Sequence, residues 1–287
     1  MSNETPRMSL KDAIRSLNES PISRTVDLRH AARDAEYHGV LAEFATDGSC
    51  PFCGGLPPWH TNPVLHRECH WLLTRNMKPY ENAREHLLAV CPRHITHLQD
   101  LTLGREETFD VEPSDVLALY TLYEDTYSDF NRVGELPPAL IIRFGNTRLS
   151  GATIAHLHAH VILPSGRGED RSALCQPAAP QALAQGPCGL QSFAGRLPPD
   201  CNQHIVIHRD PTFSKEREPP RWLRFLSCFQ FLTVLSRGFE GGGAVIHGEN
   251  RYSMTDMHAH LIAPRHAQNE ETPVVWFPIG NVRFPVG

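Results

Sequence analysis

His156, His158 and His160 alternate with apolar residues in the sequence HLHAH. The alternation continues to Leu163, which predicts a β-strand with the three imidazoles on one face. A neutral imidazole is a good nucleophile toward phosphorus, and neighbouring rings can orient it, hold a phosphate oxygen or move a proton. Spacing alone leaves two other interpretations open: the row binds a metal ion directly, or it is the polar face of a sheet.

Two cysteines lie in a turn rich in proline and glycine, with the sequence CPFCGG. Cys50 and Cys53 at this spacing supply two thiolates, which is half of a tetrahedral metal site. With His94 after a predicted strand and His156 at the start of the histidine row, we expect a Cys2His2 zinc site. Such a closed site would be structural and would not activate water.

Other histidines and cysteines have weaker claims to this site. His97 is the main competitor to His94, and His86 is a weaker one. The chain has eight cysteines in 287 residues, too few for a disulfide scaffold, so we expect mostly reduced thiols. The cysteines outside the CPFCGG turn are scattered, and we expect them to be small buried or partly buried residues.

The composition indicates a globular protein that binds neither nucleic acid nor a membrane surface. Hydrophobic residues make up 40% of the chain, enough for one large or two modest cores. Lys and Arg number 27 against 32 Asp and Glu, a net charge of -5 with no long run of either sign. No apolar stretch approaches the about 20 residues of a membrane span, and no signal-peptide core is visible, so we expect a cytoplasmic protein.

Apolar runs bounded by turn residues predict the elements that position these groups. Strands are expected at 71–73, 87–90 and 139–142. A helix with apolar residues at helical spacing is expected to begin after an N-cap at Ser114 and to end at Gly134. This helix should cover one face of a sheet.

The same order of elements returns in the second half of the chain. Residues 203–207 and 243–246 resemble strands of the first half, with an apolar helix expected between them at 221–237. The second copy ends in DMHAHLIAP at 256–264, against HLHAHVILP in the first, so that Asp256 replaces the first histidine. We therefore predict a duplicated module of strand, strand, helix, strand, strand, whose two copies share one antiparallel sheet.

This duplication divides the chain into four predicted parts. They are an N-terminal arm at 1–45 with a helical pattern near its start, a catalytic module with the zinc site at 46–166, a linker at 167–200 rich in Pro, Ala, Gly and Gln, and a degenerate second module at 201–287. In the second module, His258 and His260 could form another metal or phosphate site. They could also be relics of the duplication, polar residues on the corresponding strand or contributors to a shared cleft.

The sequence EHLLAVCPRH at 85–94, joined to the HxHxH strand, resembles the histidine-triad superfamily of nucleotide hydrolases and transferases. Two details resemble its branch of galactose-1-phosphate uridylyltransferase and diadenosine tetraphosphate phosphorylase. One is the CPFC knuckle ahead of the first strands, and the other is Gly-Ala-Thr at 151–153. The duplicated module is also typical of that branch. The resemblance covers about residues 48–164 and, more weakly, 200–266, and it implies an α+β fold with helices packed on a histidine-triad-like antiparallel sheet.

The resemblance also implies roles for individual residues. His158 matches the nucleophile of the family. The zinc ligands would be Cys50, Cys53, His94 and His156. Contacts to the nucleoside and the phosphates would come from Asn76, Asn146, Gly151 and Thr153. By their residue types alone, Asn76, Asn146 and Thr153 could equally be turn or strand-edge residues.

His160 departs from the pattern of that branch. The branch normally has glutamine at this position, whereas the hydrolases of the superfamily keep histidine. An imidazole can give or take a proton at the leaving group or at water, which an amide cannot do. His160 therefore favours hydrolysis, while the rest of the motif pattern resembles a transferase.

We expect a zinc-containing nucleotide hydrolase or nucleotidyltransferase that acts through a covalent nucleotidyl-histidine at His158, with His160 as the second catalytic group. The substrate would be a nucleoside phosphate, a dinucleoside polyphosphate or a nucleotide sugar, and the protein would be a monomer or a homodimer. The alternative is a catalytically silent nucleotide-binding or zinc-stabilised regulatory protein built on the same scaffold.

Overall fold

The computed structural model describes residues 25–28, 35–101, 115–130, 136–166, 177–196, 201–210, 219–248, 257–264 and 279–282. The expected caps Ser114 and Gly134, the substituted Asp256 and the helical pattern near the N-terminus lie outside these described residues. Within them, no helix is long and apolar enough to cross a membrane.

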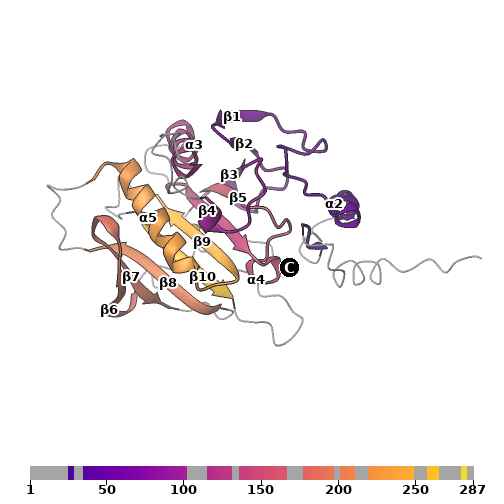
Figure 1. The fold of residues 1–287 in the computed structure, drawn as a ribbon. Coiled ribbons are helices and arrows are strands. Elements are labelled where there is room, and N and C mark those ends of the chain that lie inside the picture. Colours follow the sequence, from indigo (N-terminus) through magenta and orange to yellow (C-terminus); the bar gives the residue numbers. More distant parts are fainter. Residues whose placement is uncertain are drawn as a thin grey trace, which may run out of the picture.

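The described residues contain one antiparallel sheet of ten strands (Figure 1). In their order across the sheet the strands are β1 (Val64–Glu68), β2 (Trp71–Arg75), β3 (Ala83–Val90), β5 (His158–Pro164), β4 (Ala139–Gly145), β9 (Gly241–His247), β10 (His258–Pro264), β8 (Cys201–Arg209), β7 (Leu190–Gly195) and β6 (Pro177–Gln185). The two copies meet where β4 pairs with β9, and from there the strands follow in the same order in both directions. The predicted α+β fold with a duplicated module is confirmed.

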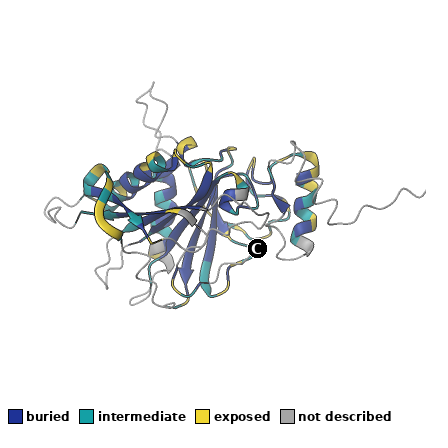
Figure 2. Ribbon diagram, turned by 90° about the horizontal axis from the view of Figure 1, so that it is seen from below, coloured by how far each residue is buried: buried dark blue, intermediate teal, exposed yellow. Residues whose placement is uncertain are grey.

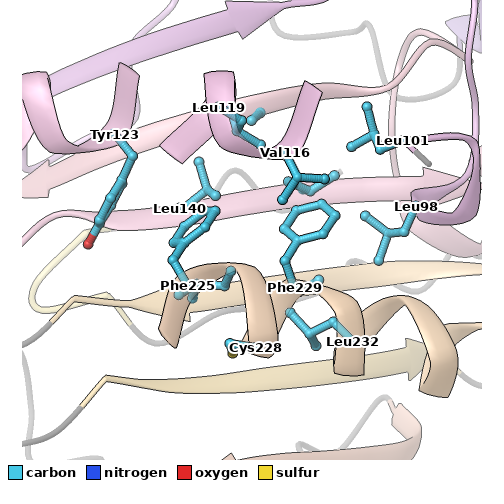
Figure 3. Close-up of a cluster of buried hydrophobic side chains, with 14 of the residues drawn as sticks. Leu98, Leu101, Val116, Leu119, Tyr123, Leu140, Phe225, Cys228, Phe229 and Leu232 are labelled. Atoms are coloured by element: carbon cyan, nitrogen blue, oxygen red, sulfur yellow. The ribbon is translucent and has the colours of Figure 1, made fainter. Parts of the chain in front are cut away.

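Two amphipathic helices, α3 (Asp115–Phe130) and α5 (Arg221–Ser236), pack on one face of this sheet. Figure 3 shows Val116 and Leu119 of α3 beside Phe225 and Phe229 of α5, all of them buried over Leu140 of β4. The helix of the first copy and the helix of the second therefore share one hydrophobic core. Shorter helical segments are α2 (Ala35–Asp47), α4 (Thr147–Ser150), η2 (Leu98–Asp100) and η4 (Pro187–Gly189).

The opposite face of the sheet carries the polar groups. Along β5, Ala159 and Val161 belong to the core under the helices, so His158 and His160 must point to the other face. Two smaller apolar clusters lie on that face, one of them formed with Ile141 of β4. Figure 2 shows that the central strands are buried and that exposed residues gather on the helices and loops.

Part of the segment that we predicted to be an arm packs against the first module. Val26 forms an antiparallel bridge with Ile154, and the backbone N–H of Asp27 donates to the carbonyl of Thr153 at 2.7 Å. Val26 and Leu41 are buried together with sheet residues. This segment therefore supports the loop that leads into β5.

Strands β6 and β7 lie in the segment that we expected to be a linker. β6 is the edge of the sheet and is mostly exposed, so its sequence PAAPQALAQ lacks apolar alternation, and an edge strand tolerates proline. β7 does bury Leu190 and Phe193, but its run is too short to stand out in a sequence. β1, the other edge strand, was missed for the same reason. The boundaries of the four parts stay a prediction.

The shared core under α3 and α5 predicts how the two modules depend on each other. Phe229→Ala removes a ring that is 2% exposed between the helices, and it should lower the free energy of unfolding by about 3 to 5 kcal/mol. Val234→Ala, at a half-exposed position of the same helix, should change it by less than about 0.5 kcal/mol. Urea denaturation measures both values. Equal losses in the two variants would contradict this account of the core.

Candidate functional site

The histidine row is divided between a bend and a strand. β5 begins at His158, which pairs with Val90 of β3. His156 lies in the bend before this strand. The predicted strand was therefore two residues too long at its start. His158 and His160 remain neighbours on one face, with ring centroids 5.0 Å apart.

His156 points to the cysteine knuckle. Its Nδ1 lies 3.3 Å from Sγ of Cys50 and 3.9 Å from Sγ of Cys53, while Nδ1 of His94 lies 3.2 Å from Sγ of Cys53. The four donor atoms all lie within 4.8 Å of one another. A tetrahedron with two sulfurs at 2.3 Å and two nitrogens at 2.0–2.1 Å from a metal has edges of about 3.3 to 3.8 Å. These four residues could therefore hold one metal ion.

The neutral state of His156 and the position of its proton also suit a metal ligand. Nε2 of His156 bonds to the carbonyl of Cys91 and must carry the proton, so Nδ1 presents its lone pair to the thiols. Burial lowers the pKa of His156 to about 4, which keeps the ring neutral. Burial raises the pKa of the Cys50 thiol to about 11, and a bound cation would reverse this effect by coordinating the thiolate.

The competing histidines are held elsewhere. Nδ1 of His97 bonds to Oγ1 of Thr96 at 2.9 Å, and His86 bonds to His160.

The turn that carries Cys50 and Cys53 is held by Gly54. The N–H of Gly54 donates to the carbonyl of Pro92, two residues before His94. Gly54 has φ +88°, a conformation that favours glycine.

His158 is a buried imidazole with one free ring nitrogen lone pair. Its Nδ1 donates to the carbonyl of His156 at 2.6 Å, so Nε2 carries the lone pair. Burial lowers the pKa of His158 to about 4, the bond to that carbonyl opposes this effect, and the charge of Arg143 adds to it. The ring of Phe52 packs against it at 5.3 Å. His158 is therefore neutral and oriented, as a nucleophile must be.

Arg143 is a site residue that the sequence patterns did not identify. It lies on β4 two residues after Ile141, which pairs with His160, so it shares the histidine face of the sheet. It is buried, and its Nη1 donates to the carbonyl of Ser150 at 2.7 Å. Among the described residues no carboxylate pairs with it. One signal was available, since a charged residue in the apolar run ALIIRF is unusual for a buried strand.

Asn76 reaches the histidine face through another residue. Its Nδ2 lies 3.1 Å from Nε2 of His86, and that nitrogen lies 2.9 Å from Nδ1 of His160. The ring of Tyr80 stacks on His160 with centroids 5.9 Å apart. Asn76 and His160 are therefore brought into one cluster, joined by His86, whose importance the sequence did not reveal.

Asn146, Gly151 and Thr153 lie in the loop between β4 and β5. The carbonyl of Asn146 accepts N–H groups of the short α4, and Gly151 ends this turn with φ +66°. Oγ1 of Thr147 donates to the buried carboxylate of Asp27 at 3.1 Å. This loop is therefore held by Asp27 of the N-terminal segment and, through the carbonyl of Ser150, by Arg143 of β4. That these loop residues contact phosphate stays a prediction.

A second histidine cluster occupies the corresponding face of the second module. One ring nitrogen each from His247, His258 and His260 lies within 4.8 Å of the others, so the three could hold another metal ion. The rings of His247 and His258 stack at 4.7 Å. Burial lowers the pKa values of His247 and His260 well below the usual range, which keeps both rings neutral.

Comparison with known proteins assigns the fold. No family model and no curated protein sequence matches the chain. Solved structures do, among them uridylyltransferase (14% identity, TM-score 0.51, 77% of this chain and 83% of that one). A GalT-like protein from Arabidopsis thaliana matches with 14% identity and a TM-score of 0.51 over 76% of this chain and 82% of that one. ADP-glucose phosphorylase from Arabidopsis thaliana matches with 12% identity and a TM-score of 0.52 over 75% and 80%.

The chain therefore shares the fold of these solved structures. In particular, it has the architecture of uridylyltransferase and of ADP-glucose phosphorylase. The resemblance noted in the sequence motifs is confirmed at the level of the fold.

The four-residue cluster predicts a definite metal content. Cys53→Ser and His94→Ala should each lose one metal ion per chain and lower the melting temperature, because each removes one of the four donor atoms of the cluster. Cys69→Ser and His97→Ala, outside the cluster, should keep the metal. Elemental analysis of the purified variants measures this. An unchanged metal content in Cys53→Ser would contradict the assignment.

Proposed function

We propose that the protein is a nucleotidyl hydrolase or transferase that uses His158 as a nucleophile toward the α-phosphate of a nucleotide. The observation that carries this proposal is the state of His158. It is buried and neutral, its proton is committed to the carbonyl of His156, and its Nε2 lone pair lies on the same face as a buried guanidinium. An oriented lone pair beside a cation suits attack on an anionic phosphate.

The proposed reaction has two steps. In the first, the Nε2 lone pair of His158 forms a bond to the α-phosphorus while the bond from phosphorus to the leaving oxygen breaks, and that oxygen departs with the electron pair. In the second, water or another phosphate attacks the same phosphorus, and the electrons of the N–P bond return to Nε2. When water attacks, it releases one proton to solvent. The positive charge of Arg143 stabilises the negative charge on the phosphoryl oxygens in both steps.

Zinc is the metal we propose for the four-residue cluster, because two thiolates and two imidazoles are a donor set that it prefers. All four positions would be taken by protein ligands, so zinc would supply rigidity and no reactive water. Through His156, the cluster would hold the carbonyl that orients His158.

The remaining predicted residues complete the proposal. Asn76 would hold the nucleoside, and Asn146, Gly151 and Thr153 would contact the phosphates from the loop before β5. The fold shared with uridylyltransferase, and with an ADP-glucose phosphorylase that was solved with bound ADP-glucose, supports a nucleotide sugar or a related nucleoside polyphosphate as the substrate.

Replacement of the nucleophile tests the proposal. His158→Ala should abolish turnover while the metal content and melting temperature stay nearly unchanged, because His158 is no metal ligand. Incubation with labelled adenine, guanine and uracil nucleotides should leave an acid-labile label on the native protein and none on the variant. Retained turnover in the variant would refute the proposal. Tight binding of nucleotide without label would instead indicate a silent nucleotide-binding protein.

Replacement of the buried cation tests the phosphate contact. Arg143→Gln keeps a donor for the carbonyl of Ser150 but removes the charge, and it should slow labelling by about 100-fold. Arg143→Lys keeps the charge but loses the planar two-nitrogen geometry of the guanidinium. Its labelling rate should therefore lie between that of the native protein and that of Arg143→Gln. Equal rates in all three proteins would show that Arg143 does not face the phosphate.

A further inference from the structure

The two modules place a pair of hydrogen-bonded histidines at equivalent positions. In the first, Nε2 of His86 on β3 lies 2.9 Å from Nδ1 of His160 on β5. In the second, Nε2 of His204 on β8 lies 2.9 Å from Nδ1 of His260 on β10. The strand registers are the same, with His160 opposite the residue two after His86, and His260 opposite the residue two after His204. All four rings are buried.

The backbone determines which nitrogen is protonated in the first pair. The N–H of Tyr80 donates to Nδ1 of His86 at 3.1 Å, so this nitrogen carries a lone pair and Nε2 carries the proton. His86 must then donate from Nε2 to Nδ1 of His160. Because Nδ1 of His160 accepts, the proton of this second ring is on Nε2.

Asn76 makes a contact that disagrees with this assignment. Its Nδ2 lies 3.1 Å from Nε2 of His86, and an amide nitrogen does not accept a hydrogen bond. Turning the amide would direct Oδ1 at His86, at the cost of the bond that Oδ1 accepts from the N–H of Lys78 at 2.9 Å. The other tautomer of His86 would direct a proton at the N–H of Tyr80, which belongs to the backbone. The side chain of Asn76 can turn and the backbone cannot, so the assignment stands.

The second pair has the opposite arrangement. Nδ1 of His204 lies 2.7 Å from the carbonyl of Arg196, and a carbonyl only accepts, so Nδ1 carries the proton. In a neutral ring with its proton on Nδ1, Nε2 carries the lone pair and accepts from Nδ1 of His260 at 2.9 Å. His260 is left with a lone pair on Nε2, where His160 has a proton.

We propose that His86 is a positioning residue that holds His160 as a neutral hydrogen-bond donor, with the proton of His160 on Nε2. The role in catalysis rests on the proposed function. A neutral Nε2–H donates a hydrogen bond to a phosphoryl oxygen, as a glutamine amide would, and it is too weak an acid to deliver a proton. Nδ1 is occupied by His86 and does not take a proton from water. The histidine at position 160 therefore does not by itself favour hydrolysis over transfer.

Long-range 1H–15N spectra of the full-length protein labelled with 15N-histidine test the tautomers directly. Signals are assigned by their loss in His160→Gln and His260→Gln. We expect the proton on Nε2 in His160 and on Nδ1 in His260, so the second module is the internal reference. The same tautomer in both residues, or a proton on Nδ1 of His160, would overturn the inference. This readout does not depend on turnover, so it separates failure of the inference from failure of the proposed function.

Labelling rates test the consequence for catalysis. His160→Ala removes the donor and should slow formation of the covalent label by about 100-fold. His160→Gln restores an N–H donor and should recover labelling to within about tenfold of the native rate. Equal losses in the two variants would show that His160 acts by proton transfer and would overturn the inference.

Variants of His86 test whether it acts through His160. His86→Leu removes the donor to His160 and should slow labelling by about 10- to 100-fold, with the metal content unchanged. His86→Gln keeps an N–H near the position of Nε2 and should restore most of the rate. The matched control is His204→Gln, the equivalent position in the second module, which should leave labelling unchanged. If His86→Leu labels at the native rate, His86 has no positioning role.

Discussion

The position of β5 between β3 and β4 is the constraint on which the site depends. Backbone ladders hold both edges of this strand, and its apolar side chains pack under α3 and α5. The other face must then present His158 and His160 together, because successive side chains of a strand point to opposite sides. One edge of β4 pairs with β5 and the other pairs with β9 of the second module. The second module therefore supports the site without contributing its proposed nucleophile.

Hydrogen bonds to fixed backbone groups give the three histidines of one short motif different chemistry. His156 donates a proton to a carbonyl and turns its Nδ1 lone pair toward the cysteines of the four-residue cluster. His158 donates from Nδ1 to a carbonyl, so its lone pair is on the other ring nitrogen. His160 receives a hydrogen bond and keeps its own proton on the outer nitrogen. The residue type sets what an imidazole is able to do, and its neighbours decide which of these properties the site uses.

Local spacing and alternation of residue types were enough to predict the central strands, the duplication and the four residues that meet in the cysteine–histidine cluster. The start of β5 was misplaced, because His156 leaves the strand to reach the cysteines. The pairing of His86 with His160 and the place of Arg143 depend on the register between strands far apart in the sequence, which no local pattern reports. The edge strands β1 and β6 lacked a pattern because their residues are exposed or only partly buried on both faces.

The central claim is that His158 alone among the histidines forms a covalent bond to the nucleotide. Peptide mapping by mass spectrometry, on protein trapped with nucleotide and digested under alkaline conditions, tests it directly. The account predicts a nucleotidyl group on His158 and on no other residue. A nucleotidyl group on a different side chain, or complete turnover of substrate without any adduct, would contradict it.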